Sequence, residues 1–128
     1  MKIYLETSIF NRYFDVDPIL HPATVQLFKE IKAGKFESYT SIFVIRELEE
    51  APIEKNLKMR DIIPKFNIKI LFETPKTLDF ADLYMENNII SSRYLMDARH
   101  IAISVVNNLD KIISLNFKNI VRDKTKFF

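Results

Sequence analysis

The sequence predicts an α/β domain with three layers, α/β/α, in which helices cover both faces of a mainly parallel central sheet of four or five strands. Short segments rich in β-branched and aromatic residues alternate with longer amphipathic segments along the chain, and this alternation favours a parallel sheet. The chain has 128 residues, the usual size of one domain, so residues 1–128 are expected to form a single unit. Hydrophobic residues make up 48% of the chain, which supplies a core without disulfides.

The first strand and the first helix are expected close to the N-terminus. Lys2–Leu5 is short and β-rich, as in a buried strand. Thr7 and Ser8 offer N-caps for a short helix that runs toward Phe14. A turn-rich break is expected over residues 15–22, because a residue before proline favours extended geometry.

An amphipathic helix and the second strand are expected next. Val25, Phe28 and Ile31 share one face of this helix, and Gly34 is expected at its C-terminal stop. Phe36–Ile42 then predicts the second strand.

Two helices are expected between the second and third strands. Thr40 and Ser41 cap a helix that continues through Glu50. A further helix covers Glu54–Ile63 and ends before Pro64, since proline interrupts the helical hydrogen bonds.

The C-terminal half continues the alternation. Ile68–Phe72 predicts the third strand and Lys111–Leu115 the fourth. Between them we expect one helix after Pro75 and a strongly amphipathic helix capped by Ser91 or Ser92. The expected inner residues are Leu78, Ala81, Leu83 and Tyr84 in the former helix, and Tyr94, Ala98, Ile101, Ala102, Val105 and Val106 in the latter.

Composition excludes several classes of protein. The chain has no cysteine, which excludes a disulfide scaffold, a cysteine-ligated zinc site and a thiol nucleophile. Its one glycine, Gly34, excludes a dinucleotide-binding fingerprint and a P-loop, since each needs several glycines for close approach to phosphate. No apolar run approaches the roughly 20 residues of a membrane helix, so we expect a cytoplasmic protein without a membrane partner.

The net charge of +2 is uninformative, but basic residues gather in two places. Either cluster is expected to contact phosphates or to form a solvated surface. The clusters are Lys55, Lys58, Arg60, Lys65 and Lys69 in the middle of the chain, and Lys118, Arg122, Lys124 and Lys126 near its end.

Polar residues at the carboxyl ends of the strands form the candidate site, because functional residues of open α/β sheets gather there. Glu6 follows the first strand, and Glu47 lies in the helix after the second. Asp97 lies early in the helix that leads into the fourth strand, and Asn116 follows that strand. Asp110 opens the fourth strand and is expected at the opposite end.

These segments together resemble PIN domains. Lys2–Ser8 looks like the opening strand of that family, closed by an acid and a hydroxyl residue, and Phe43–Leu48 looks like its helix with a single glutamate. Asp97–Ala102 resembles the third motif, an acid with histidine three positions on, and Ile113–Ile120 resembles the fourth. The resemblance covers nearly the whole chain and is greatest to VapC-type toxin nucleases of bacterial and archaeal toxin–antitoxin pairs. It implies a PIN-like domain.

The resemblance also implies the chemistry, a metal-dependent endoribonuclease that hydrolyses RNA to leave a 5′-phosphate and a 3′-hydroxyl. Carboxylates brought close together repel, and Mg²⁺ or Mn²⁺ relieves that repulsion with oxygen ligands. We expect Glu6 and Asp97 to hold the principal ion, and Glu47 to bind a second ion or orient the attacking water. Asn116 is expected to fix a metal-bound water. Glu6 stands where the family more often has Asp, and Asn116 where some members have Asp.

Three further side chains are expected to support this site. Thr7 and Ser114 are expected behind the acidic groups. His100, one turn after Asp97, either orients a carboxylate, touches substrate or is a half-buried structural histidine. Glu6 has an alternative role as a helix N-cap partner.

The expected partners are RNA, a second copy of the chain and an antitoxin protein. Tyr13, Phe14 and Lys118 are the candidates for contact with RNA bases or backbone. Two alternatives stay open: a catalytically weakened PIN domain that binds RNA, and a protein-interaction module.

Overall fold

The computed structural model describes residues 1–15, 18, 20–88 and 95–115, and its strands and helices alternate as expected. In order they are β1 (Lys2–Leu5), α1 (Thr7–Phe14), α2 (Leu20–Lys32), β2 (Glu37–Ser41), α3 (Ile42–Leu48), α4 (Ile53–Lys65), β3 (Lys69–Leu71), α5 (Pro75–Asn88), α6 (Leu95–Val106) and β4 (Lys111–Ile113).

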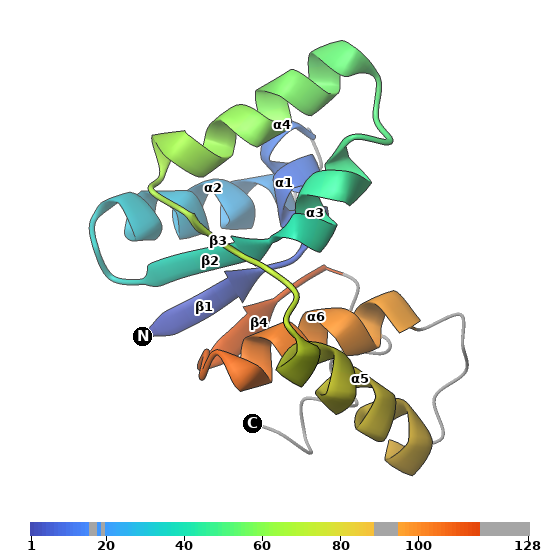
Figure 1. The fold of residues 1–128 in the computed structure, drawn as a ribbon. Helices are drawn as coiled ribbons and strands as arrows, with labels where there is room; N and C mark the ends of the chain where they lie inside the picture. The colour runs from blue at the N-terminus through green and yellow to red at the C-terminus, as the bar shows by residue number, and fades with distance from the viewer. Residues whose placement is uncertain (16–17, 19, 89–94, 116–128) are drawn as a thin grey trace.

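The described strands form one parallel sheet in the order β3-β2-β1-β4. Helices α1 to α4 lie on one side of this sheet and α5 with α6 on the other (Figure 1). The predicted three-layer fold with a parallel sheet of four strands is therefore confirmed. None of the helices in the described part of the chain has the length and apolarity that crossing a membrane requires.

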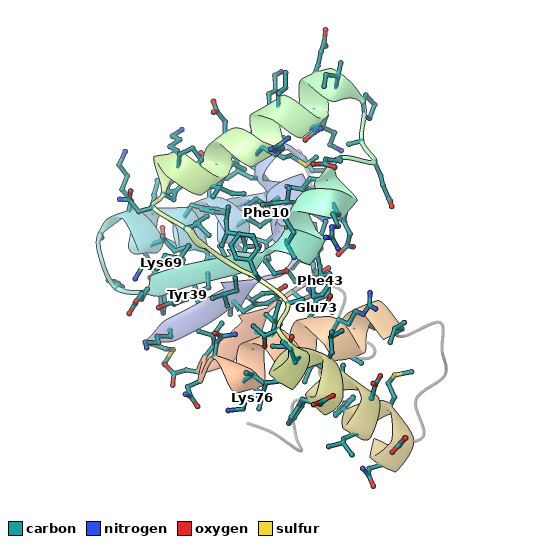
Figure 2. All side chains as sticks on the ribbon, in the orientation of Figure 1. Phe10, Tyr39, Phe43, Lys69, Glu73 and Lys76 are labelled. Atoms are coloured by element: carbon teal, nitrogen blue, oxygen red, sulfur yellow. The ribbon has the colours of Figure 1, made fainter. Side chains whose placement is uncertain are left out.

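The core fills both spaces between the sheet and its helices. Tyr4 and Leu5 of β1 and Phe10 of α1 are fully buried, and Phe43 of α3 is 1% exposed. Ile101 supplies apolar surface from α6 on the other face. Figure 2 places Phe10 and Phe43 well inside the outline of the molecule. Because β1 is central and buried, the residue that follows it is held in a rigid setting.

Three helices end with the same turn before entering a strand. Gly34, Asn67 and Asn108 have positive φ angles of 85°, 54° and 59° after α2, α4 and α6. In each turn the next backbone N–H donates to a carbonyl five residues back, which satisfies a carbonyl left free at the helix end. The bonds are Lys35 to Glu30, Ile68 to Ile63 and Leu109 to Ser104. The C-terminal stop predicted at Gly34 is therefore confirmed.

A surface network joins β2 to β3 near their amino ends. Lys69 Nζ donates to Glu37 Oε1 at 2.7 Å, and the Tyr39 hydroxyl donates to the same oxygen at 2.5 Å. These hydrogen bonds, that from Lys69 first, lower the pKa of Glu37 to about 2. Lys69 and Tyr39 lie together at this edge in Figure 2.

Some predicted boundaries were wrong. The first helix begins at Thr7 and its N-cap is Glu6, in place of the predicted caps Thr7 and Ser8. The break after Asp15 is shorter than predicted, because Pro22 lies in the first turn of α2, where a missing N–H breaks no helical bond. Pro64 lies in the last turn of α4, so that helix continues to Lys65.

The inner side predicted for α5 was half wrong. Ala81 and Tyr84 are buried as expected, but Leu78 is 40% exposed and Leu83 is 56% exposed. Thr77 takes their place on the buried side, at the spacing of four and three residues that defines one helix face. The caps Ser91 and Ser92, and the inner residue Tyr94, lie outside the described residues.

Candidate active site

The carboxyl ends of β1 and β4 define the place of the site. From β1 the chain adds β2 and β3 on one side, and then returns to add β4 on the other side. Ligands of open parallel sheets bind at such a reversal of strand order. Glu6 and Ser114 follow these two strands directly, and Ser114 Oγ donates a hydrogen bond of 2.8 Å to Glu6 Oε1.

Glu6 is held by one of its two carboxylate oxygens. Oε1 accepts hydrogen bonds from Ser8 N (3.0 Å), Ser8 Oγ (2.6 Å) and Ser114 Oγ (2.8 Å). The contact with Ser8 N caps helix α1, so the N-cap role considered for Glu6 is real. Within the described chain, Oε2 has no hydrogen-bond partner. A carboxylate that is 7% exposed and fixed through one oxygen leaves the other for a ligand.

Ser8 connects α1 to the segment after β4. Its hydroxyl donates to Glu6 and accepts a hydrogen bond of 2.8 Å from Leu115 N. Sequence reasoning treated Ser8 only as a helix cap. The position of Ser8 two residues after Glu6 could have indicated its contact with that carboxylate, because serine hydroxyls readily form hydrogen bonds with nearby groups at the start of a helix.

Glu47 and His100 form the second part of the site. His100 Nε2 lies 2.9 Å from Glu47 Oε1, and the His100 side chain is 2% exposed. Because a carboxylate accepts hydrogen bonds, Nε2 donates the proton. The histidine on α6 therefore orients the glutamate on α3, across 53 residues of sequence.

Tyr4 and Ser41 lie behind His100 and were not predicted as site residues. The Tyr4 hydroxyl is 2.5 Å from His100 Nδ1 and 2.6 Å from Ser41 Oγ, all in buried surroundings. Burial raises the pKa of the Tyr4 phenol far above its ordinary value, so the hydroxyl keeps its proton. A consistent arrangement of hydrogen bonds has Ser41 donating to Tyr4, Tyr4 donating to His100 Nδ1, and His100 Nε2 donating to Glu47.

The arrangement fits a divalent cation with oxygen ligands. Ligand atoms of Glu6, Glu47 and His100 lie within 4.8 Å of one another. Each carboxylate has one oxygen bonded to the protein and a second oxygen without a partner among the described residues. Both nitrogens of His100 are already hydrogen-bonded, so its part is to hold Glu47. Two carboxylates so close are the ligands that Mg²⁺ or Mn²⁺ prefers.

The other predicted site residues have different positions. Asp97 is half-buried in the first turn of α6, three residues before His100, and is not among the described residues of the 4.8 Å group. Thr7 is buried, and its Oγ1 has no hydrogen-bond partner within the described chain. Asn116 and Lys118 lie outside the described residues. Asp110 lies at the opposite end of the sheet as expected, where its Oδ2 accepts from Lys2 N at 2.7 Å.

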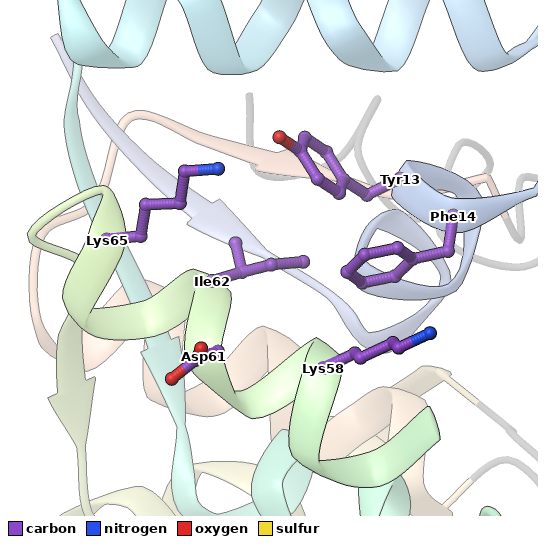
Figure 3. Close-up of a pocket in the computed structure, with 6 residues that line it drawn as sticks. All are labelled: Tyr13, Phe14, Lys58, Asp61, Ile62 and Lys65. Carbon is purple, nitrogen blue, oxygen red and sulfur yellow. The ribbon is translucent and has the colours of Figure 1, made fainter. Parts of the chain in front are cut away.

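Tyr13 and Phe14, two of the predicted RNA contacts, lie apart from this group. They line a pocket of about 180 Å³ between α1 and α4, together with Lys58, Asp61, Ile62 and Lys65 (Figure 3). None of these lining residues hydrogen-bonds to Glu6 or Glu47.

The architecture is that of a PIN-like domain. It is similar to VapC20 of Mycobacterium tuberculosis, a toxin that cleaves the sarcin-ricin loop, with a TM-score of 0.70 and 14% identity over 91% of each chain. It is also similar to a chain of VapBC2 from Rickettsia felis, a complex bound to a DNA fragment from its promoter, with a TM-score of 0.64 and 17% identity over 94% of this chain and 93% of that one. At these identities the likeness shows the fold. No protein-family model and no curated protein matches the sequence.

Proposed function

We propose that this protein is a divalent-metal-dependent endoribonuclease and the toxin of a toxin–antitoxin pair. The observation that carries the proposal is the pair of carboxylates, Glu6 and Glu47, brought together at the reversal of strand order. Among the described residues, nothing hydrogen-bonds to the second oxygen of either carboxylate, which leaves one oxygen of each for a cation. The likeness of the fold to VapC20 supports RNA as the substrate.

The residues of this chain prepare the reaction by fixing charge and geometry. Ser8 and Ser114 hold Glu6 through Oε1, and His100 holds Glu47. Asp97 supplies a third carboxylate from the start of α6. Glu6, Glu47 and Asp97 would hold Mg²⁺ or Mn²⁺, which would neutralise charge on the scissile phosphate and polarise it. With these groups preorganised, in-line hydrolysis of the phosphodiester needs little further rearrangement of the protein.

The partners proposed for this chain are RNA, an antitoxin and a second copy of the chain. A VapBC complex among the similar structures supports an antitoxin partner. Coexpression with the product of a neighbouring small gene, followed by copurification and relief of growth inhibition, is the direct test. Size-exclusion chromatography with light scattering tests the homodimer.

Cleavage of a structured RNA pool in Mn²⁺, Mg²⁺ or chelator tests the enzyme. Glu6→Gln and Asp97→Asn are each expected to reduce the cleavage rate by more than roughly 100-fold. Removing a metal ligand should lower activity more than removing an outer contact of a ligand, which typically costs about 10- to 100-fold. Glu50→Gln and Asp82→Asn are the matched controls, since Glu50 lies just after α3, Asp82 lies in α5, and both side chains are exposed. Wild-type rates in either site variant would show that the assigned site is wrong.

A further inference from the structure

A second pocket opens beside Ser8, and it differs from the pocket in Figure 3. Its volume is about 390 Å³, within the range of small-ligand sites. Helix α1, the start of α4 and the segment after β4 each contribute to it. Its lining consists of Ser8, Asn11, Arg12, Asp15, Lys55 and Leu115.

Ser8 makes this pocket continuous with the candidate active site. Its hydroxyl bonds to Glu6 Oε1 at 2.6 Å, and Leu115 N bonds to the same hydroxyl at 2.8 Å. Two lining residues of the pocket therefore lie within one or two hydrogen bonds of the metal-binding carboxylate. A chain bound at the carboxylates would reach the pocket directly.

The pocket offers hydrogen-bond donors and positive charge. Lys55 is exposed and forms no ion pair within the described chain. Arg12 is 33% exposed and donates from Nη1 to Asp15 at 2.8 Å, which leaves its other nitrogens as donors. Asn11 adds an amide. Among the described lining residues the one carboxylate is that of Asp15, and it is already bonded to Arg12.

We propose that this pocket binds a backbone phosphate of a single-stranded RNA, next to the phosphate that is cleaved. The inference rests on the proposed nuclease function. Carboxylates at the cleavage site repel the polyanionic substrate, so a neighbouring positive site is needed to hold the strand in place. Arg12, four residues after Ser8 on α1, and Lys55, which lines the same pocket from α4, supply that charge.

The pocket of Figure 3 is a poorer candidate for the same role. It is lined by apolar side chains as well as charged ones and includes neither Ser8 nor any residue bonded to Glu6. Its Lys58, exposed on α4 three residues after Lys55, therefore gives a matched control. The two lysines share charge, helix and exposure, and differ in the pocket that they line.

Binding of a short fluorescent single-stranded RNA, measured in chelator across a salt series, tests the subsite without turnover. Lys55→Gln and Arg12→Gln are each expected to weaken binding about 10-fold, and to reduce the slope of log affinity against log salt by about 0.7. Arg12→Lys should retain most of the affinity because it keeps the charge. Asp15→Asn should bind more tightly, whereas Lys58→Gln should stay within about twofold of wild type.

Steady-state cleavage separates this proposal from the nuclease assignment. In Lys55→Gln the KM is expected to rise about 10-fold with kcat unchanged, because the lost contact binds substrate and transition state alike. If wild type cuts RNA and Lys55→Gln behaves as Lys58→Gln does in both assays, the subsite is wrong while the nuclease stands. If wild type binds RNA through Lys55 yet does not cut, the subsite stands and the nuclease fails. Absence of any RNA binding overturns both.

Discussion

At the scale of single residues, the buried hydroxyl of Tyr4 connects the sheet to the Glu47 carboxylate of the candidate site. It bonds to His100, which in turn holds Glu47. Tyr4→Phe keeps the ring but removes this link, so Glu47 is expected to lose its fixed orientation. We expect kcat to fall by roughly 10- to 100-fold, as for outer contacts of metal ligands, with KM little changed. Single-turnover cleavage at saturating enzyme measures the effect.

Stability provides a second readout of the Tyr4 substitution. Removal of the hydroxyl leaves Ser41 Oγ and His100 Nδ1 without their buried partner, at a cost of about 1–3 kcal/mol. Tyr39→Phe is the control, because it removes a hydroxyl bonded to Glu37 on the surface. A Tyr4→Phe variant that is less stable but cuts RNA at the wild-type rate would show that Tyr4 is structural only.

The sequence predicted that some residues of the candidate site lie together because their signal is local. Glu6 and Ser114 each follow a strand, and parallel strands bring such residues to one edge. Tyr4 and Ser41 could not be predicted in this way. Tyr4 contacts Ser41, 37 positions away in the sequence, and His100, 96 positions away. These contacts depend on the strand order and on the direction of each side chain, and neither can be read from the sequence of a buried strand. Whether Asp97 completes the site stays a prediction.

At the scale of elements, the turn after α6 aligns β4 with β1. Asn108 has a φ of 59° there, a left-handed conformation that asparagine tolerates and alanine does not. Asn108→Ala is expected to cost about 1 kcal/mol, or roughly 2–4 °C in Tm, while Asn108→Gly should be neutral or nearly so. Thermal denaturation of the two variants measures this difference. Equal melting temperatures would mean that the turn adapts without strain.

Whether a segment is a helix or a strand was predictable from its hydrophobic periodicity and from the positions of glycine and proline. The boundaries and the buried faces of these elements were predicted less accurately. Gly34 and Pro75 marked a helix end and a helix start correctly, because their backbone limits are intrinsic. Thr7 and Ser8 were the predicted caps and Glu6 was only an alternative, since glutamate is not a preferred cap. Leu78 and Leu83 were assigned inward because they are apolar, yet α5 packs mainly on α6 (Figure 1) and buries only a narrow face.

At the scale of the whole molecule, the order β3-β2-β1-β4 decides where the candidate site lies. It places β4 against β1, so that Ser114 meets Glu6 across 108 residues of sequence. Alternation of strands and helices predicts a parallel sheet but not which strands are neighbours. The location of the candidate site at one edge was therefore predictable, whereas the pairing of its residues required the fold.

Metal binding is expected to stabilise the whole molecule. The carboxylates of Glu6 and Glu47 repel each other in the folded chain, and an ion that binds only the folded state removes that cost. At about 100 times its Kd, Mn²⁺ should add about 2.7 kcal/mol to the free energy of unfolding. Glu6→Gln should abolish this response and Glu50→Gln should preserve it, so the shift on adding Mn²⁺ is compared within each variant by urea denaturation. If wild type shows no shift at millimolar Mn²⁺ and yet binds RNA, the chain is an RNA-binding domain that has lost catalysis. A shift that survives in Glu6→Gln would instead place the ion elsewhere.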